Sequence, residues 1–210
     1  MPSTRYPIVR ARHRVDVVID RSRFICTVAP AEHVDAAQSF VRNVSREMPD
    51  ATHHCWAYVV GAPGSTDRIG LSDDGEPHGT AGRPMLMVLQ HSDVGDVVAV
   101  VTRYYGGTKL GTGGLVKAYG GAVQLALESA PRAMHVTRLS LVATVSYAAI
   151  SAIRQRLPDF EADVLDETFG VDVQLRLQCP EEHEPGLRRA LLDITRGNAE
   201  IGAPIPSRVE

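Results

Sequence analysis

Residues 97–123 of the chain are VVAVVTRYYGGTKLGTGGLVKAYGGAV. The segment 96–104 is dominated by valine and other apolar residues, a pattern typical of a buried strand. A glycine-rich loop follows at 106–114, and residues 115–130 predict a helix that packs against the sheet until Pro131 ends it. The apolar face of this helix consists of Leu115, Tyr119, Ala122, Val123, Ala126 and Leu127.

Upstream of this stretch, the chain alternates between β-branched runs and one amphipathic segment. The turn Asp20-Arg21-Ser22 joins two such runs and predicts a hairpin. A polar segment with four glycines follows further on, and its length for a compact domain favours a functional role. In chain order we expect strands at 12–20 and 23–29, a helix at 31–48, a strand at 53–60, a loop at 70–84 and a helix at 85–91.

The last third of the chain has a different order of elements. We expect strands at 138–146, 161–168, 171–178 and 199–205, with helices at 148–157 and 181–195. This βαββαβ order is the ferredoxin-like pattern. The predicted fold class is therefore α+β, with a first α+β domain at 1–132 and a ferredoxin-like second domain at 135–210.

Composition places the 210-residue chain among ordinary globular proteins, with 44% hydrophobic and 22% charged residues. The apolar run at 97–101 is far shorter than the ~20 residues of a membrane-spanning helix. The N-terminus lacks the pattern of a signal peptide. We therefore expect a cytoplasmic location and no membrane partner. The three cysteines lie far apart, so neither a disulfide framework nor a zinc motif is predicted.

The charge distribution separates the two predicted domains. Residues 1–134 hold 14 Lys and Arg against 13 Asp and Glu, whereas residues 135–210 hold 8 against 12. Six arginines within the first 23 residues suggest a basic edge. A net charge of −3 argues against a protein that coats nucleic acid by bulk charge. Any nucleic-acid surface should thus be local and lie on the first domain, and the second domain is the better candidate for a protein partner.

The segment SDDGEPH at 72–78 holds three acids and one histidine. Clustered carboxylates suit a hard cation, but short acidic loops are commonly turns whose aspartates accept backbone hydrogen bonds. His53 and Cys55 should share one face of a strand, which leaves a metal site short of ligands unless His78 joins them. We prefer the turn and expect no metal and no cofactor.

The loop at 106–114 fits neither a P-loop nor a dinucleotide fingerprint, because Thr112-Gly113 and Val116 stand where those motifs need other residues. A cation and two tyrosines before a glycine-rich loop suit RNA, since arginine meets phosphate and tyrosine can stack on a base. The alternative is that the tyrosines pack under the loop and the glycines only form turns. The residues alone leave these two interpretations open.

Three ordered motifs, THHCWAYVV at 52–60, SDDGEPHGTAGRP at 72–84 and the stretch 97–123, resemble the IMPACT family, and within it the bacterial YigZ-type branch. The resemblance covers about residues 15–130, and the βαββαβ segment is similar to the small second domain of bacterial members. It implies domains similar to a small-subunit ribosomal protein and to the fourth and fifth domains of the translocating elongation factor. It also implies translation regulation in relatives, without an established reaction.

From residues and resemblance together, we expect a cytosolic regulator of translation or of a stress response that binds structured RNA or the ribosome. The expected nucleic-acid contacts are Arg103, Tyr104, Lys109 and Lys117. The residues expected to shape the loop are Gly106, Gly107, Gly111, Gly113 and Gly114. The residues expected to brace it are Asp73, Asp74, Glu76, Thr80 and Arg83, with the acids paired to Arg83 or Arg103, so that Asp74→Ala should destabilise the protein as well as inactivate it.

Two alternatives remain beside this expectation. One is a metal-dependent hydrolase that uses Asp73, Asp74, Glu76, His53 and His78. The other is a protein-interaction module whose loops dock a partner. Stoichiometric metal in the purified protein would favour the first, and binding that does not weaken with salt would favour the second.

Overall fold

The structure is a computed structural model, and it describes residues 4–206. The chain divides into two compact units between His135 and Val136. The sequence placed the two domains at 1–132 and 135–210, and the ends of those ranges, residues 1–3 and 207–210, lie outside the described residues. Each unit has its own hydrophobic core, and the mixed α+β fold class is confirmed.

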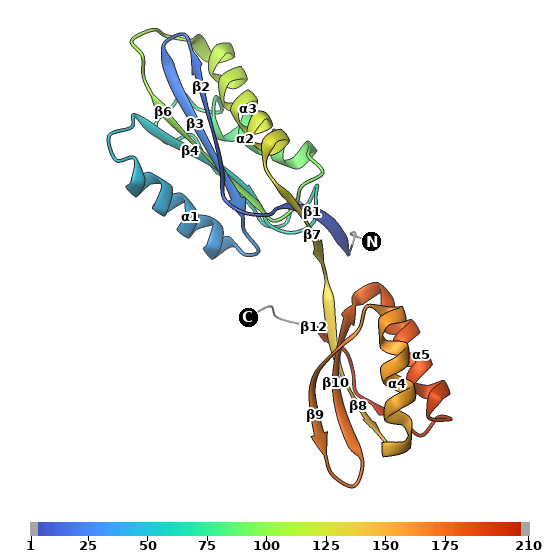
Figure 1. Ribbon diagram of the computed structural model, residues 1–210. Coiled ribbons are helices and arrows are strands. Elements are labelled where there is room, and N and C mark those ends of the chain that lie inside the picture. The colour runs from blue at the N-terminus through green and yellow to red at the C-terminus, as the bar shows by residue number, and fades with distance from the viewer. Residues whose placement is uncertain (1–3, 207–210) are drawn as a thin grey trace. The chain divides into compact units, whose positions relative to one another are not determined.

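The first unit is built on a five-stranded sheet with the order β2-β3-β6-β4-β5, in which every neighbouring pair is antiparallel. Helices α2 and α3 cover one face, and α1 covers the other (Figure 1). A separate two-stranded sheet joins β1 and β7. The elements are β1 (Arg5–Val9), β2 (His13–Ile19), β3 (Ser22–Pro30), α1 (Val34–Glu47), β4 (His53–Val59), β5 (Ile69–Ser72), α2 (Gly82–His91), β6 (Val97–Tyr104), α3 (Gly111–Ser129) and β7 (Arg132–Val136).

Strand β6 lies at the centre of this sheet and is buried almost throughout. Its side chains alternate between the faces, as the period of two requires. Val97, Ala99 and Val101 pack with α2 and α3, whereas Val98 and Val100 pack on the side of α1. The predicted run of valines is therefore a strand covered on both faces, which explains why it lacks polar alternation.

The predicted hairpin is confirmed as β2 and β3, with Asp20 and Arg21 both at positive φ in the turn. The start of α3 differs from the expectation. The helix begins at Gly111, so Gly111, Gly113 and Gly114 belong to its first turn and not to the loop. Glycine disfavours helix interiors, which is why the sequence pattern placed the start four residues later. The loop that remains is short and spans residues 105–110.

The second unit has the strand order β11-β8-β10-β9, with β12 also on β8, and all pairs are antiparallel. Numbered within the βαββαβ motif this order is 4-1-3-2, so the predicted ferredoxin-like topology is confirmed. Alternate residues of β8 and β10 face α4 and α5, and they form the core. The elements are β8 (Arg138–Val145), η1 (Tyr147–Ala149), α4 (Ile150–Arg156), η2 (Leu157–Phe160), β9 (Asp163–Phe169), β10 (Val173–Pro180), η3 (Glu181–His183), α5 (Glu184–Ile194), β11 (Glu200–Ile201) and β12 (Ile205–Pro206).

Across the described residues 4–206, the helices are too short or too polar to cross a membrane.

Candidate functional site

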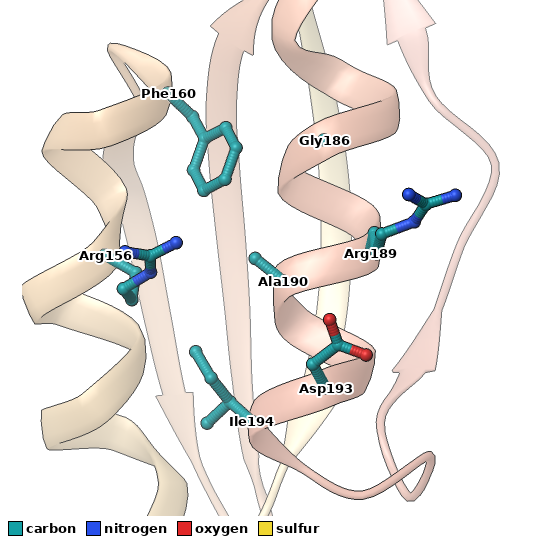
Figure 2. A pocket seen from close by; sticks show the side chains of 7 residues that line it. All are labelled: Arg156, Phe160, Gly186, Arg189, Ala190, Asp193 and Ile194. Atoms are coloured by element: carbon teal, nitrogen blue, oxygen red, sulfur yellow. The ribbon is translucent and has the colours of Figure 1, made fainter.

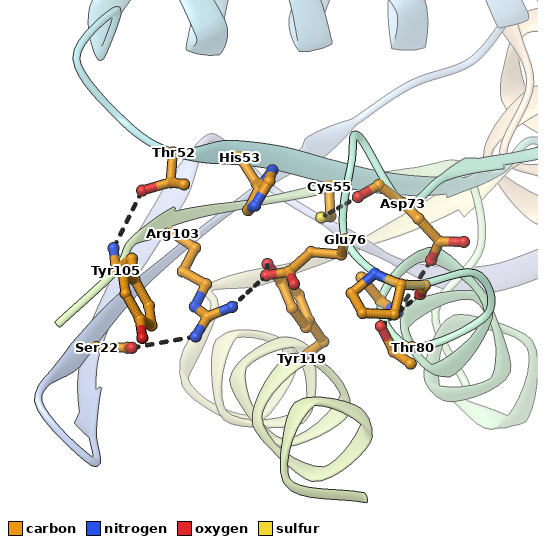
Figure 3. Close-up of polar contacts among 12 residues, drawn as sticks. Ser22, Thr52, His53, Cys55, Asp73, Glu76, Thr80, Arg103, Tyr105 and Tyr119 are labelled. Carbon is orange, nitrogen blue, oxygen red and sulfur yellow. Dashed lines mark hydrogen bonds and ion pairs between the residues drawn. The ribbon is translucent and has the colours of Figure 1, made fainter. Parts of the chain in front are cut away.

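A buried polar network lies under the glycine-rich loop of the first unit (Figure 3). The Glu76 carboxylate accepts a hydrogen bond from Arg103 Nη1 at 2.6 Å and another from the Tyr119 hydroxyl at 2.7 Å. The side chains of Glu76 and Arg103 are only 3% and 6% exposed. The predicted pairing of an acid of the 72–78 loop with Arg103 is thus present, and it is a desolvated ion pair with a tyrosine as third partner.

The backbone explains how three distant segments meet at this network. In the register of the sheet, Arg103 lies opposite Phe24 of β3 and His53 of β4. By alternation Arg103 follows Val101 on the face of α2 and α3, where Tyr119 of α3 is fully buried. The loop after β5 brings Glu76 over the same face. The network therefore joins β6, α3 and the acidic loop.

The Arg103 guanidinium is held on several sides. Its carbon lies 5.3 Å from the centre of the Phe24 ring and 5.4 Å from that of the Tyr105 ring. Nη2 donates to Ser22 Oγ at 3.2 Å, and Ser22 Oγ also accepts the backbone N–H of Gly106. Nε is buried without a hydrogen-bond partner among the described residues. The guanidinium is consequently fixed in position and is screened from solvent.

Asp73 braces the acidic loop through the backbone. Its carboxylate accepts N–H bonds from Gly79 at 2.7 Å, Gly82 at 2.8 Å and Ala81 at 3.0 Å. Burial by itself raises the pKa of Asp73, but these three donors outweigh it and hold the pKa below its ordinary value. Thr80 closes the turn by donating its hydroxyl to the Pro77 carbonyl. The turn interpretation of the acidic segment is what this geometry shows.

Asp74 has a smaller structural role than expected. Its carboxylate accepts the backbone N–H of His54 at 2.6 Å, and its own carbonyl accepts from His53 Nδ1 at 2.7 Å. The residue is exposed and forms no ion pair with the described residues. The large loss of stability expected for Asp74→Ala from a broken buried pair is therefore reassigned to Glu76.

Three expectations for the site need correction. Arg103 is buried and paired, so its guanidinium is not presented to a ligand. Tyr104 lies on the opposite face of β6, where it packs near α1 and donates to Asp50 at 3.1 Å, because adjacent strand residues point to opposite sides. Arg83 is exposed on α2 without an ion-pair partner within residues 4–206, so it does not brace the loop.

The structure adds Ser22 and Tyr119 to the site, which the sequence reasoning missed. It also places Tyr105 there, which the sequence offered only as one of the two tyrosines before the loop. Tyr119 was placed only as an apolar helix position, and Ser22 only as a turn residue. One signal was available in the sequence, because strand alternation places the side chains of Arg103 and Tyr104 on opposite faces of the sheet. No local pattern marked Ser22, because it reaches the site only through the pairing of β3 with β6.

Three exposed cationic side chains lie on the β2–β3 turn, the loop 105–110 and the first part of α3. Lys109 and Lys117 are exposed and lack ion-pair partners in the described part of the chain, and so does Arg21 in the β2–β3 turn. That turn lies beside the loop 105–110 and the start of α3 (Figure 1). Contact is close, since a Cβ on Gly106 would lie 1.9 Å from the Arg21 carbonyl oxygen. The carboxylates of Asp73 and Glu76, in contrast, are turned inward.

Much of the basic edge expected from the N-terminal arginines is neutralised. Arg12 and Arg14 both pair with Glu47, and Arg23 pairs with Asp16. The pKa of Glu47 is lowered to about 2 by the hydrogen bonds from Arg12 and Arg14. Arg12 and Arg14 therefore link the start of β2 to α1, and Arg23 links β3 to β2, rather than forming a separate cationic surface.

The described residues contain no group of three or more His, Cys, Asp or Glu side chains placed to hold a metal ion. Most of the side chains proposed for a hydrolase have other partners, because Glu76 accepts from Arg103 and Asp73 accepts from backbone amides. The side chain of His78 is turned to solvent. Burial raises the pKa of the Cys55 thiol to about 12, so this thiol is not a ready nucleophile. Among the described residues of this loop, the His78 Nδ1–Asp73 Oδ2 contact of 3.8 Å involves a fully exposed imidazole and an aspartate whose carboxylate already accepts backbone hydrogen bonds.

Grooves elsewhere are explained by packing. Figure 2 shows one of about 240 Å³ in the second unit, where Phe160 packs against α5. Gly186 permits this contact, since a Cβ there would lie 3.0 Å from the Phe160 ring. The lining residues are Arg156, Phe160, Gly186, Arg189, Ala190, Asp193 and Ile194. A groove of about 370 Å³ in the first unit lies between α2 and α3, away from the polar network, and includes the ion pair of Arg132 with Asp93.

Comparison with known proteins covers both units. Residues 20–127 match the Impact N-terminal domain, and residues 144–198 match a domain of unknown function (DUF1949). The chain is 42% identical to IMPACT family member YigZ of Escherichia coli (strain K12), over 87% of this chain and 90% of that protein. It is 32% identical to IMPACT family member YvyE of Bacillus subtilis (strain 168), over 93% and 89%.

A solved structure described as that of a hypothetical protein superposes with a TM-score of 0.71 at 40% identity, covering 97% of this chain and 98% of the other. The matched regions contain the strands, the acidic loop and the glycine-rich loop from which the site is built. Agreement at this level over both units shows that the chain belongs to the IMPACT family.

Proposed function

We propose that the first unit binds structured RNA or a ribosomal surface, and that the protein regulates translation or a stress response in the cytoplasm through this contact. The binding surface comprises the loop 105–110, the start of α3 with Lys117, and Arg21 of the adjacent turn. We call this surface the glycine-loop surface. Lys109 and Lys117 keep their predicted role as phosphate contacts, and Arg103 becomes a positioning residue beneath them.

One observation carries this proposal, namely that two acids of the 72–78 loop point into internal hydrogen bonds, whereas three cations at this end of the unit are exposed beside the exposed Asp20 and Asp74. Asp73 and Glu76 are consumed by internal donors, whereas Lys109, Lys117 and Arg21 face solvent unpaired within residues 4–206. A net charge of −3 therefore does not describe the local potential. Phosphate recognition depends on such a local cluster of free cations.

The backbone of the loop 105–110 and of the first turn of α3 would let a ligand approach closely. Added Cβ atoms on Gly107, Gly111 or Gly113 would meet nothing within 4 Å, so these positions are open on their outer side. The first turn of α3 has no side-chain cap, which leaves its backbone N–H groups available to phosphate. These features add to the lysines, and the same surface suits RNA better than an apolar protein partner.

The test is fluorescence anisotropy of the full chain with a labelled ribosomal RNA hairpin at increasing salt. We expect binding that weakens steeply with salt and a slope that is shallower by about 1.4–1.8 in Lys109→Ala/Lys117→Ala, because two phosphate contacts are removed. Arg42→Ala/Arg46→Ala is the matched control, since it removes the same charge from α1 on the other face of the sheet.

Two results would overturn the proposal. The first is the absence of RNA binding by the unchanged protein at low salt. The second is an equal loss in the lysine variant and in the α1 control, which would mean that only net charge matters. Binding of a protein partner that is insensitive to salt would instead favour the docking alternative.

A further inference from the structure

Tyr105 occupies an unusual place on the glycine-loop surface. It is the first residue beyond β6, its side chain is 47% exposed, and its backbone N–H donates to Thr52 Oγ1 at 3.1 Å. This large aromatic residue at the start of a polar loop is therefore outside the core, and its backbone is tied to Thr52. Phosphate contacts by the lysines do not explain why an aromatic ring lies on this surface.

The inner side of this ring rests on a charged support. The Arg103 guanidinium lies over the Tyr105 ring at 5.4 Å and over the Phe24 ring at 5.3 Å, so the cation contacts two aromatic rings. Glu76 and Ser22 fix the guanidinium from its edges. Figure 3 shows Arg103 between Tyr105 on one side and Glu76 on the other. The ring is thus oriented before any ligand arrives.

Tyr105 remains 47% exposed although it contacts Arg103, so part of the residue is open to a ligand. Gly106 and Gly107 follow directly and carry no side chain, and Gly107 has space beyond its Cα. Gly106 lies so close to the Arg21 backbone that a side chain there would not fit. Lys109, in the same loop, is exposed to meet a phosphate.

We propose that Tyr105 is a stacking platform for one unpaired nucleobase, so that the preferred ligand is RNA with a bulged, looped or terminal base rather than a continuous duplex. This inference rests on the proposed function and adds its ligand class. A flat ring fixed on one face by a guanidinium offers its other face to a base at little entropic cost. Bases within a duplex are stacked on one another and cannot be reached by such a ring.

Arg103 acts through Tyr105 in this scheme. It holds the ring but does not itself reach the ligand, because its side chain is 6% exposed. This arrangement accounts for a buried arginine directly under the cationic surface, where a purely electrostatic site would place it outside. Arg103 is accordingly a positioning residue.

The experiment uses two labelled RNA hairpins with the same stem, one fully paired and one with a single bulged 2-aminopurine. We expect the full chain to bind the bulged hairpin about tenfold more tightly and to quench the 2-aminopurine fluorescence, as stacking on an aromatic ring does. Tyr105→Leu should remove both the preference and the quenching while the paired hairpin still binds. Tyr105→Phe keeps the ring and should retain both.

The outcomes separate this inference from the proposed function. Equal binding of the two hairpins by the unchanged protein, or an undiminished preference in Tyr105→Leu, overturns the stacking platform and leaves the RNA surface standing. Failure to bind either hairpin overturns both. Unfolding of Tyr105→Leu, followed by the fluorescence of Trp56, should match that of Tyr105→Phe, which shows that a lost preference is not a lost fold.

Discussion

Substitution of Glu76 by glutamine tests the buried network most directly. Glutamine has nearly the shape of glutamate, but it leaves the Arg103 guanidinium without its carboxylate in a site where both side chains are almost wholly buried. Removing one partner of a buried pair destabilises a protein by about 3–5 kcal/mol. Because an amide oxygen can still accept from Arg103 or Tyr119, we expect the lower end, about 3 kcal/mol.

This free energy corresponds to a large shift in melting temperature. The first unit spans Met1–His135, and an unfolding entropy of about 2.1 cal/mol/K per residue makes 1 kcal/mol worth about 3.5 °C. Glu76→Gln should therefore lower the melting temperature of the first unit by roughly 10 °C. The second unit has a separate core, so its transition should not move.

Tryptophan fluorescence can observe the first unit alone. The chain has one tryptophan, Trp56, which lies on β4 against the core under α1. Asp93→Asn is the matched control, because Asp93 pairs with Arg132 at the same 2.6 Å but on the surface. Exposed pairs contribute about 0–1 kcal/mol, so this control should shift the melting temperature by less than about 4 °C.

A double-mutant cycle with Arg103→Met completes the test. If the pair is coupled, the summed losses of unfolding free energy in the two single variants should exceed the loss in the double variant by about 2 kcal/mol or more. A shift for Glu76→Gln no larger than that of Asp93→Asn, or strictly additive losses, would refute the argument that desolvation makes this pair important.

Three further predictions concern the same unit. Because folding lowers the pKa of Asp73, its carboxylate stabilises the fold fully at pH values above the ordinary pKa of 3.8 and progressively less as the pH falls through the lower pKa of the folded state. Urea unfolding should therefore show that the free energy of unfolding falls less between pH 6 and pH 3 in Asp73→Asn than in the unchanged protein. Gly106→Ala should destabilise the protein by about 1–3 kcal/mol, because the new Cβ clashes with the Arg21 backbone. Gly113→Ala should be neutral or stabilising by up to about 1 kcal/mol, because its Cβ meets nothing within 4 Å and the residue lies in α3. Equal melting temperatures of the two variants would contradict this prediction. All three cysteine thiols are buried, so a thiol reagent such as Ellman's reagent should label them only as the protein unfolds, and rapid labelling in native buffer would show that a core opens.

The sequence by itself was sufficient for the fold class and most element positions, since these depend on residues close together in the chain. The valines of 97–101 predicted a buried strand, and the βαββαβ order of the last third predicted the ferredoxin-like topology now seen. It was not sufficient at glycine-rich boundaries. There, propensity argued against the helix that begins at Gly111, and packing of α3 on the sheet overrode it.

The tertiary structure decided which residues of the site face a ligand. From the sequence, Arg103 was predicted to contact phosphate, because an arginine near tyrosines and glycines suits RNA. The fold instead pairs it with Glu76, 27 positions away, and with Ser22, 81 positions away. Whether a charge lies in solvent or in a desolvated pair depends on every segment packed around it, and β3, α3 and the acidic loop meet at Arg103 only once the sheet has assembled.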